Sequence, residues 1–117
     1  MLRGSRRYRL TGTGVFEALF RSGRRREGQF LQLISVPAAR EIGRTGIVIG
    51  RKALPLAVDR NRVRRLLRVR LHEARPAIEC YDLVLRLKKR TVRSEFASIA
   101  DEAARLLAAI AANRESP

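Results

Sequence analysis

The chain has 117 residues and a mass of 13.3 kDa, which is the size of one domain and too small for two. Its residues are 45% hydrophobic and 32% charged, so it can bury a core and is not a disordered chain. Lys and Arg number 26 against 11 acids, for a formal net charge of +15, and 23 of the 26 are Arg. This excess requires an anionic partner, and the planar fork of Arg favours nucleic acid.

The first half of the chain predicts one short helix and two strands. Apolar residues at helical spacing, with Gly23 after them, predict a helix over about 13–22. The segment 29–36 is rich in strand-forming residues and stops at Pro37. The segment 45–49 (TGIVI) is bounded by glycines and also predicts a strand.

The second half predicts a long helix, a strand and a final helix. Apolar residues recur every 3.6 positions over 57–74, and Pro76 closes this central helix. Strict alternation over 82–88 predicts a half-exposed strand. Ser94 is the expected N-cap of a last amphipathic helix that continues to Ile110. The order α-β-β-α-β-α predicts an α/β sandwich, a small sheet with three helices, in a single domain over 1–117 whose folded body spans about 9–112.

The sequence contains no pattern typical of a catalytic or metal site, of export or of a membrane span. A single cysteine, Cys80, and a single histidine, His72, cannot form a disulfide or a Cys/His zinc site, which favours the cytoplasm. The acids are scattered, so we assign no catalytic residue and no metal ligand to this chain. The basic N-terminus lacks the apolar run of an export signal, and the longest apolar stretch, 106–112, is too short to span a membrane.

The central helix carries the strongest functional pattern. Six arginines occur within the eleven residues 60–70, and no acid interrupts them. On a helical projection one polar sector holds Arg60, Asn61, Arg64, Arg65 and Arg68, with Arg62 at its edge. A solvated polar face would normally mix Glu with its cations, so this sector predicts a surface for an RNA backbone.

These residues resemble a known family, the protein subunit of bacterial ribonuclease P. The similarity is carried by Arg44-Thr45-Gly46-Ile47, by the basic pair Arg51-Lys52, and by the run Ala57-Val58-Asp59-Arg60-Asn61-Arg62-Val63-Arg64-Arg65. It extends over nearly the whole chain, from about Arg9 to Ile110. The resemblance implies a fold similar to the second domain of ribosomal protein S5, with a left-handed βαβ crossover around the arginine helix.

The resemblance also implies two RNA-binding sites. The catalytic RNA subunit is expected on Arg60, Asn61, Arg62, Arg64, Arg65 and Arg68. The 5′ leader of precursor tRNA is expected in a cleft between the first helix and the sheet, on Phe16, Phe20, Leu33, Lys52, Arg86 and Lys88. Leu33 stands where the family often has an aromatic residue, so an apolar contact is expected there.

The implied function is that of the accessory protein subunit of an endoribonuclease that removes the 5′ leader from precursor tRNA. Catalysis belongs to the RNA subunit, which also binds most of the Mg²⁺, and neither a membrane nor a second protein is required. Composition alone leaves an alternative open, since small ribosomal and RNA-chaperone proteins are also short and rich in Arg.

Overall fold

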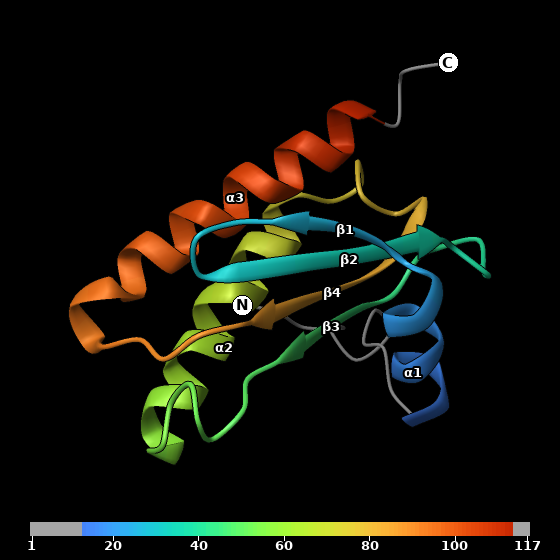
Figure 1. The fold of residues 1–117 in the computed structure, drawn as a ribbon. Coiled ribbons are helices and arrows are strands. Elements are labelled where there is room, and N and C mark those ends of the chain that lie inside the picture. Colours follow the sequence, from blue (N-terminus) through green and yellow to red (C-terminus); the bar gives the residue numbers. More distant parts are fainter. Residues whose placement is uncertain (1–12, 114–117) are drawn as a thin grey trace.

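A four-stranded sheet with the strand order β1-β2-β4-β3 forms the centre of the molecule (Figure 1). The computed structural model describes residues 13–113. The elements are α1 (Thr13–Ser22), β1 (Arg24–Glu27), β2 (Leu31–Pro37), β3 (Thr45–Val48), α2 (Ala57–Glu73), β4 (Tyr81–Leu87), a 3₁₀ turn (Arg93–Glu95) and α3 (Phe96–Asn113). No helix in this described part of the chain is long and apolar enough to cross a membrane.

The connection from β3 through α2 to β4 has the less common hand. β3 pairs with β4 in parallel, whereas the β1–β2 and β2–β4 pairs are antiparallel. Figure 1 shows both parallel strands running to the left, β4 above β3, and α2 passing behind the sheet. This path makes the crossover left-handed, as the resemblance implied, although most such connections are right-handed.

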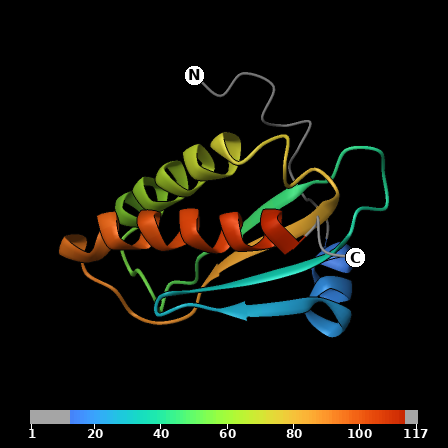
Figure 2. The same cartoon turned by 90° about the horizontal axis from the view of Figure 1, so that it is seen from above.

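The two faces of the sheet are buried to different extents. Figure 2 shows α2 and α3 on one side of the sheet and α1 on the other. The main core lies between the sheet and the two long helices, and its largest buried strand residues are Leu31, Leu33, Leu83, Leu85 and Leu87. On the other face Leu19 of α1 packs on Ile34 and Val84, in a much smaller cluster. The rest of that second face is left free to carry polar groups.

The structure differs from the predicted elements in two places. The segment RRRE, residues 24–27, forms the edge strand β1, which the sequence did not predict because it has no alternating apolar residues. Ser94 is not an N-cap, because it lies inside the 3₁₀ turn and α3 begins at Phe96. The backbone N–H of Val92 donates instead to the Glu95 carboxylate, at 2.9 Å. The other boundaries agree within about three residues.

A buried carboxylate on α3 fixes the β1–β2 hairpin. Glu102 is 4% exposed and accepts hydrogen bonds from the backbone N–H groups of three consecutive residues, Gln29, Phe30 and Leu31. Gly28 is required beside it, since a Cβ at this position would lie 2.4 Å from the carboxyl carbon of Glu102. The carboxylate therefore satisfies the donors of the hairpin turn and ties that turn to α3.

A second buried carboxylate, that of Asp82, fixes the loop between β2 and β3. Its carboxylate is 4% exposed, accepts the backbone N–H of Arg44 at 2.7 Å and pairs with the Arg44 guanidinium at 3.8 Å. The two buried carboxylates thus fix the two loops that flank β2.

We expect Glu102→Ala to lower the free energy of unfolding by about 2–5 kcal/mol, because three backbone donors lose a charged acceptor. Chemical denaturation measures the change. Asp101→Asn is the matched control, because the exposed Asp101 pairs at the surface with Arg70 at 3.8 Å and with no other residue that the structure describes. Its effect should stay within about 0.5 kcal/mol. Equal effects of the two variants would show that Glu102 does not anchor the hairpin.

Candidate nucleic-acid interface

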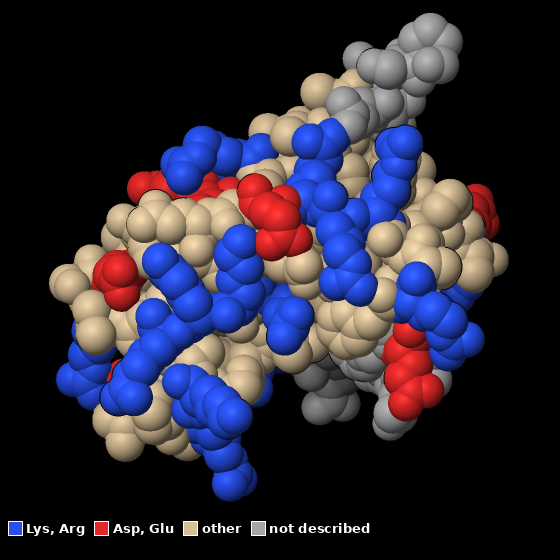
Figure 3. Space-filling view, viewed as in Figure 1, with Lys and Arg blue, Asp and Glu red and all other residues tan. Residues whose placement is uncertain are grey.

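Basic side chains gather on two surfaces of the molecule. The first is the solvent side of α2, called the α2 outer face, with Asn61, Arg62 and Arg65 at its centre and Arg60, Arg64 and Arg68 along one side. The second is the part of the sheet that α1 leaves uncovered, called the open sheet face, with Arg25, Glu27, Gln32, Arg86 and Lys88. Figure 3 shows Lys and Arg outnumbering Asp and Glu on the side that includes the open sheet face.

The spacing of the buried residues of α2 determines which of its side chains lie on the α2 outer face. Val63, Leu67 and Leu71 are buried against the sheet and α3. Arg62 and Arg65 lie away from this stripe and are exposed. Neither makes a hydrogen bond or ion pair with another described residue, so no group in that part of the chain engages the donors of either guanidinium.

Other polar groups of the predicted helix sector have partners within the fold. Arg60 donates from Nη1 to the carbonyl oxygens of Leu54 and Pro55, each at 2.8 Å. Arg64 donates to the side chain of Asn61 at 3.3 Å. Arg60 therefore fixes the loop before α2, in addition to any contact with a partner.

A hydrogen-bonded network occupies the open sheet face. Glu27 on β1 accepts from Gln32 Nε2 at 2.6 Å and from Lys88 Nζ at 2.9 Å. The Gln32 side-chain oxygen accepts from Arg25 at 3.3 Å and from Arg86 at 3.4 Å. The hydrogen bonds from Gln32 and Lys88 lower the pKa of Glu27, so its carboxylate is ionised at neutral pH. The Glu27 carboxylate thus orders the Gln32 amide and the Lys88 ammonium group. With three cations and one acid, the network keeps a positive net charge.

Phe20 lies beside this network at the end of α1. Its side chain is half-buried and packs on the small cluster of Leu19, Ile34 and Val84. Its carbonyl oxygen accepts from the Arg25 guanidinium. The ring is therefore neither a fully buried core residue nor a free surface residue. Phe16 is also in α1, but its side chain lies outside the described residues.

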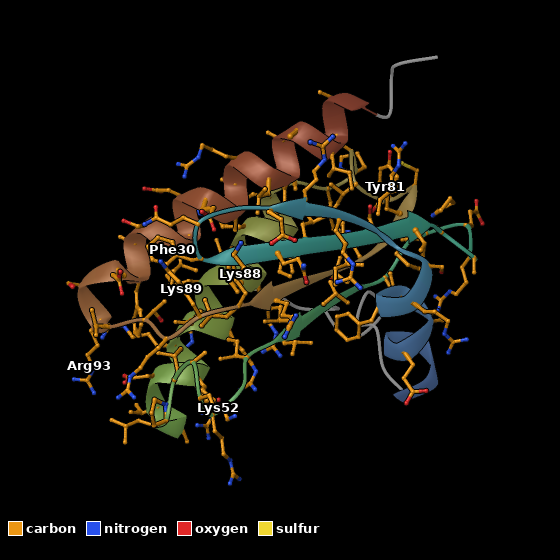
Figure 4. All side chains as sticks on the ribbon, in the orientation of Figure 1. Phe30, Lys52, Tyr81, Lys88, Lys89 and Arg93 are labelled. Atoms are coloured by element: carbon orange, nitrogen blue, oxygen red, sulfur yellow. The ribbon has the colours of Figure 1, made fainter. Side chains whose placement is uncertain are left out.

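The structure separates the remaining residues predicted to bind the leader. Arg86 projects from β4 onto the open sheet face, on the same side as Val84, and Lys88 follows directly after β4 and reaches Glu27 on that face. Lys52 is exposed in the turn between β3 and α2, and Figure 4 shows it near the N-terminal end of α2, apart from Lys88. The prediction for Leu33 is wrong, because its side chain is 0% exposed in the main core on the other face of the sheet.

Sequence reasoning missed Arg25, Glu27 and Gln32. The signal that places them is the register of β1 on β2, which pairs Arg25 with Ile34 and Glu27 with Gln32. It also missed Lys89, whose ammonium group lies 4.9 Å from the centre of the Phe30 ring. Figure 4 shows these two side chains together near the end of β4.

The described residues hold no cluster of three or more His, Cys, Asp or Glu side chains that could bind a metal ion. The acid on the open sheet face, Glu27, is engaged by Gln32 and Lys88. The acids Glu102 and Asp82 are engaged by backbone N–H groups. These donor sets do not fit a divalent metal centre held by the described part of this chain. The chemistry that both surfaces offer is binding of a polyanion.

Comparisons with known proteins agree on one family. The family model for ribonuclease P matches residues 5–111. The ribonuclease P protein component of Aromatoleum aromaticum is 33% identical over 100 residues, which cover 86% of this chain and 84% of the relative. That of Chromobacterium violaceum is 29% identical over 111 residues, which cover 95% and 92%.

Solved structures show the same fold. The RNase P protein from Thermotoga maritima, in complex with 1-(4-fluorophenyl)-2-thiourea, superposes with a TM-score of 0.73 at 23% identity. The match covers 85% of this chain and 96% of that one. The RNase P protein from Staphylococcus aureus superposes with a TM-score of 0.70 at 20% identity and covers 95% and 93%.

The different partners of two arginines on α2 lead to a stability prediction. We expect Arg60→Ala to lower the free energy of unfolding by about 1–3 kcal/mol, because two loop carbonyls lose a charged donor. Arg62→Ala should change it by less than about 0.5 kcal/mol, since no described residue pairs with Arg62. Thermal or chemical unfolding of the two variants, which remove the same charge, makes the comparison. A larger decrease for Arg62→Ala would contradict the partner assignment.

Proposed function

Because the chain belongs to the ribonuclease P protein family, the protein components of the endoribonuclease that processes the 5′ ends of tRNA, we propose that its two basic surfaces have different RNA ligands. The α2 outer face binds the catalytic RNA subunit. The open sheet face, with Phe20 at its end, binds the 5′ leader of precursor tRNA. The family relationship sets aside the alternative of a ribosomal or RNA-chaperone protein.

The observation that carries the proposal is that Arg62 and Arg65, on the α2 outer face, have no partner among the described residues. Like charges one turn apart on a helix repel each other, and nothing in the described structure compensates these two. An RNA backbone removes that repulsion, and the release of its condensed counterions provides affinity. Guanidinium forks bind phosphate oxygens bidentately without reading bases, which suits a folded RNA recognised by its backbone.

The open sheet face suits a single strand of variable sequence. Arg86 and Lys88 supply cations for phosphates, while the half-buried Phe20 supplies an aromatic surface at the same end of the sheet as α1. Unpaired bases stack on aromatic rings with little dependence on sequence. Phosphate contacts from β4 and stacking on α1 together hold a leader without demanding particular bases.

The chain contributes positioning, and the metal chemistry belongs to the RNA. Divalent metal such as Mg²⁺, held by the RNA subunit, would supply Lewis-acid chemistry for the hydrolysis, and the described residues of this chain would not be its ligands. The protein brings two polyanions together and holds the leader on one side of the cleavage site. Because the substrate is already positioned, less entropy is lost on reaching the transition state. We assign this work to the bacterial cytoplasm, where precursor tRNA is made.

Replacing two arginines tests the assignment of the α2 outer face. Arg62→Gln/Arg65→Gln should weaken binding to a ribonuclease P RNA and make it less salt-dependent. The slope of log affinity against log salt should fall by about 0.7 to 0.9 for each phosphate that the protein no longer neutralises. Filter binding over a range of salt concentrations measures both quantities, and unfolding midpoints should stay at or slightly above the wild-type value, because the repulsion between the two arginines is removed.

The matched control, Arg40→Gln/Arg105→Gln, removes the same charge from exposed positions outside α2. Equal weakening by the two double variants would mean that only net charge matters. In a separate cleavage assay the protein rigorously freed of RNA should leave precursor tRNA uncut, and site-specific cleavage by it would place catalysis in the protein.

Phe20→Leu tests the assignment of the open sheet face. The leucine keeps apolar packing on α1 but removes the ring, so affinity for leader-bearing precursor tRNA should fall by about 1–3 kcal/mol. Affinity for mature tRNA should not change. Phe96→Leu is the control, because Phe96 is a buried core ring on α3, and its replacement should lower stability and affect both ligands alike. A Phe20→Leu protein that behaved like Phe96→Leu would place Phe20 in the core.

A further inference from the structure

A hollow at the free edge of the sheet shares Arg25 with the open sheet face, and its other lining residues belong to neither proposed surface. It has a volume of about 260 Å³ and lies where β1 starts, on the side of the sheet that α3 covers. The described residues that line it are Arg24, Arg25, Arg26, Ser35, Tyr81 and Ile110, and none of these six is acidic. Figure 4 shows Tyr81 at the end of the sheet where β1 begins. A hollow of this size is smaller than typical pockets for drug-sized ligands, so any ligand it takes is a small group or one unit of a longer chain.

The register of β1 places arginines on both faces of this edge. Arg24 pairs with Ser35 and Arg26 with Leu33, so both side chains point to the face that α3 covers. Arg25 pairs with Ile34 and points to the open sheet face. The hollow and the open sheet face are therefore separated by the thickness of a single edge strand.

The arginines differ in their partners. Arg25 donates to Gln32 and to the carbonyl oxygen of Phe20. Arg24 and Arg26 make no hydrogen bond or ion pair with any other described residue. Charges on an edge strand also discourage pairing with another sheet. That role needs only charge, and it does not account for a hollow that combines two guanidinium groups with a tyrosine.

We propose that the precursor leader, after crossing the open sheet face, continues over the edge of β1 and places a further nucleotide in this hollow. Its phosphate lies between Arg24 and Arg26, and its base packs on Tyr81. The source is the leader rather than the folded RNA, because Arg25 already continues the open sheet face to this edge and only a single strand can follow so sharp a turn. The inference rests on the proposed binding of the leader to the open sheet face.

If the hollow binds a leader nucleotide, the affinity of the holoenzyme for precursor tRNA should increase a second time when the leader is long enough to reach it. Precursor tRNAs with a graded series of leader lengths are bound to the holoenzyme formed by the full chain and a ribonuclease P RNA. For the wild-type protein, affinity should rise first as the leader covers the open sheet face and again when it reaches the edge of β1. Arg24→Gln and Arg26→Gln should each lower affinity for the longest leaders about 10-fold, while short leaders bind normally.

Two comparisons separate a specific site from general charge. Arg40→Gln removes one charge from the exposed loop between β2 and β3, and it should have no effect that depends on leader length. Tyr81→Phe keeps the ring and should bind like the wild type, whereas Tyr81→Leu should weaken binding roughly 5-fold or more for long leaders only. Unfolding midpoints of every variant exclude simple loss of fold.

The outcomes distinguish the inference from the proposal beneath it. If wild-type affinity does not depend on the leader at all, the proposed leader site fails and this inference fails with it. If affinity depends on the leader but Arg24→Gln and Arg26→Gln weaken all lengths equally, or resemble Arg40→Gln, only the hollow is refuted. A photoreactive uridine in the distal leader should cross-link to peptides containing β1 or Tyr81, and cross-links confined to the open sheet face would also refute it.

Discussion

Only one face of the sheet is buried under the two long helices, and this leaves enough exposed surface for a small chain to carry a net charge of +15. Both long helices pack on the same face, over the leucines of β2 and β4, so one face provides nearly the whole hydrophobic core. The short α1 covers only one end of the other face. Burial of apolar area against α2 and α3 stabilises the fold sufficiently to leave the second face polar. Both proposed RNA surfaces, the solvent side of α2 and the uncovered part of the sheet, follow from that asymmetry.

The few acids in the chain act mainly within the fold. Glu102 and Asp82 are buried on backbone N–H groups, Asp59 pairs with Arg93 at 2.9 Å, and Glu27 orders the open sheet face. Because these carboxylates hold loops and turns, few of them neutralise the exposed arginines of α2. The chain therefore concentrates its negative charge where backbone donors need acceptors, and its positive charge where a polyanion can approach.

Periodicity in the sequence was sufficient for the elements that bury apolar side chains on one side, such as α2 and β4. It was insufficient for β1, whose four residues are all charged and which is a strand only because β2 offers it a free edge. The error at Leu33 has a related cause. Which face a strand residue takes depends on its pairing register, here Leu33 opposite Leu85, and register is a tertiary property. The arginine sector of α2 was predictable because a helix fixes its own faces, whereas the Glu27 and Gln32 network required three strands to be aligned.

The beginning of α2 shows how charge and fold are linked. The N-cap residue, Leu56, makes no side-chain cap, and the helix that follows carries cations one turn apart. The Arg60 contacts to two loop carbonyls and the Arg93 pair with Asp59 hold this end in place. An RNA that binds the α2 outer face removes the remaining repulsion, so the bound state is more stable than the free protein by the linkage between binding and folding. On the proposed assignment, the arginines that weaken the isolated helix are therefore the groups through which RNA binding would stabilise it.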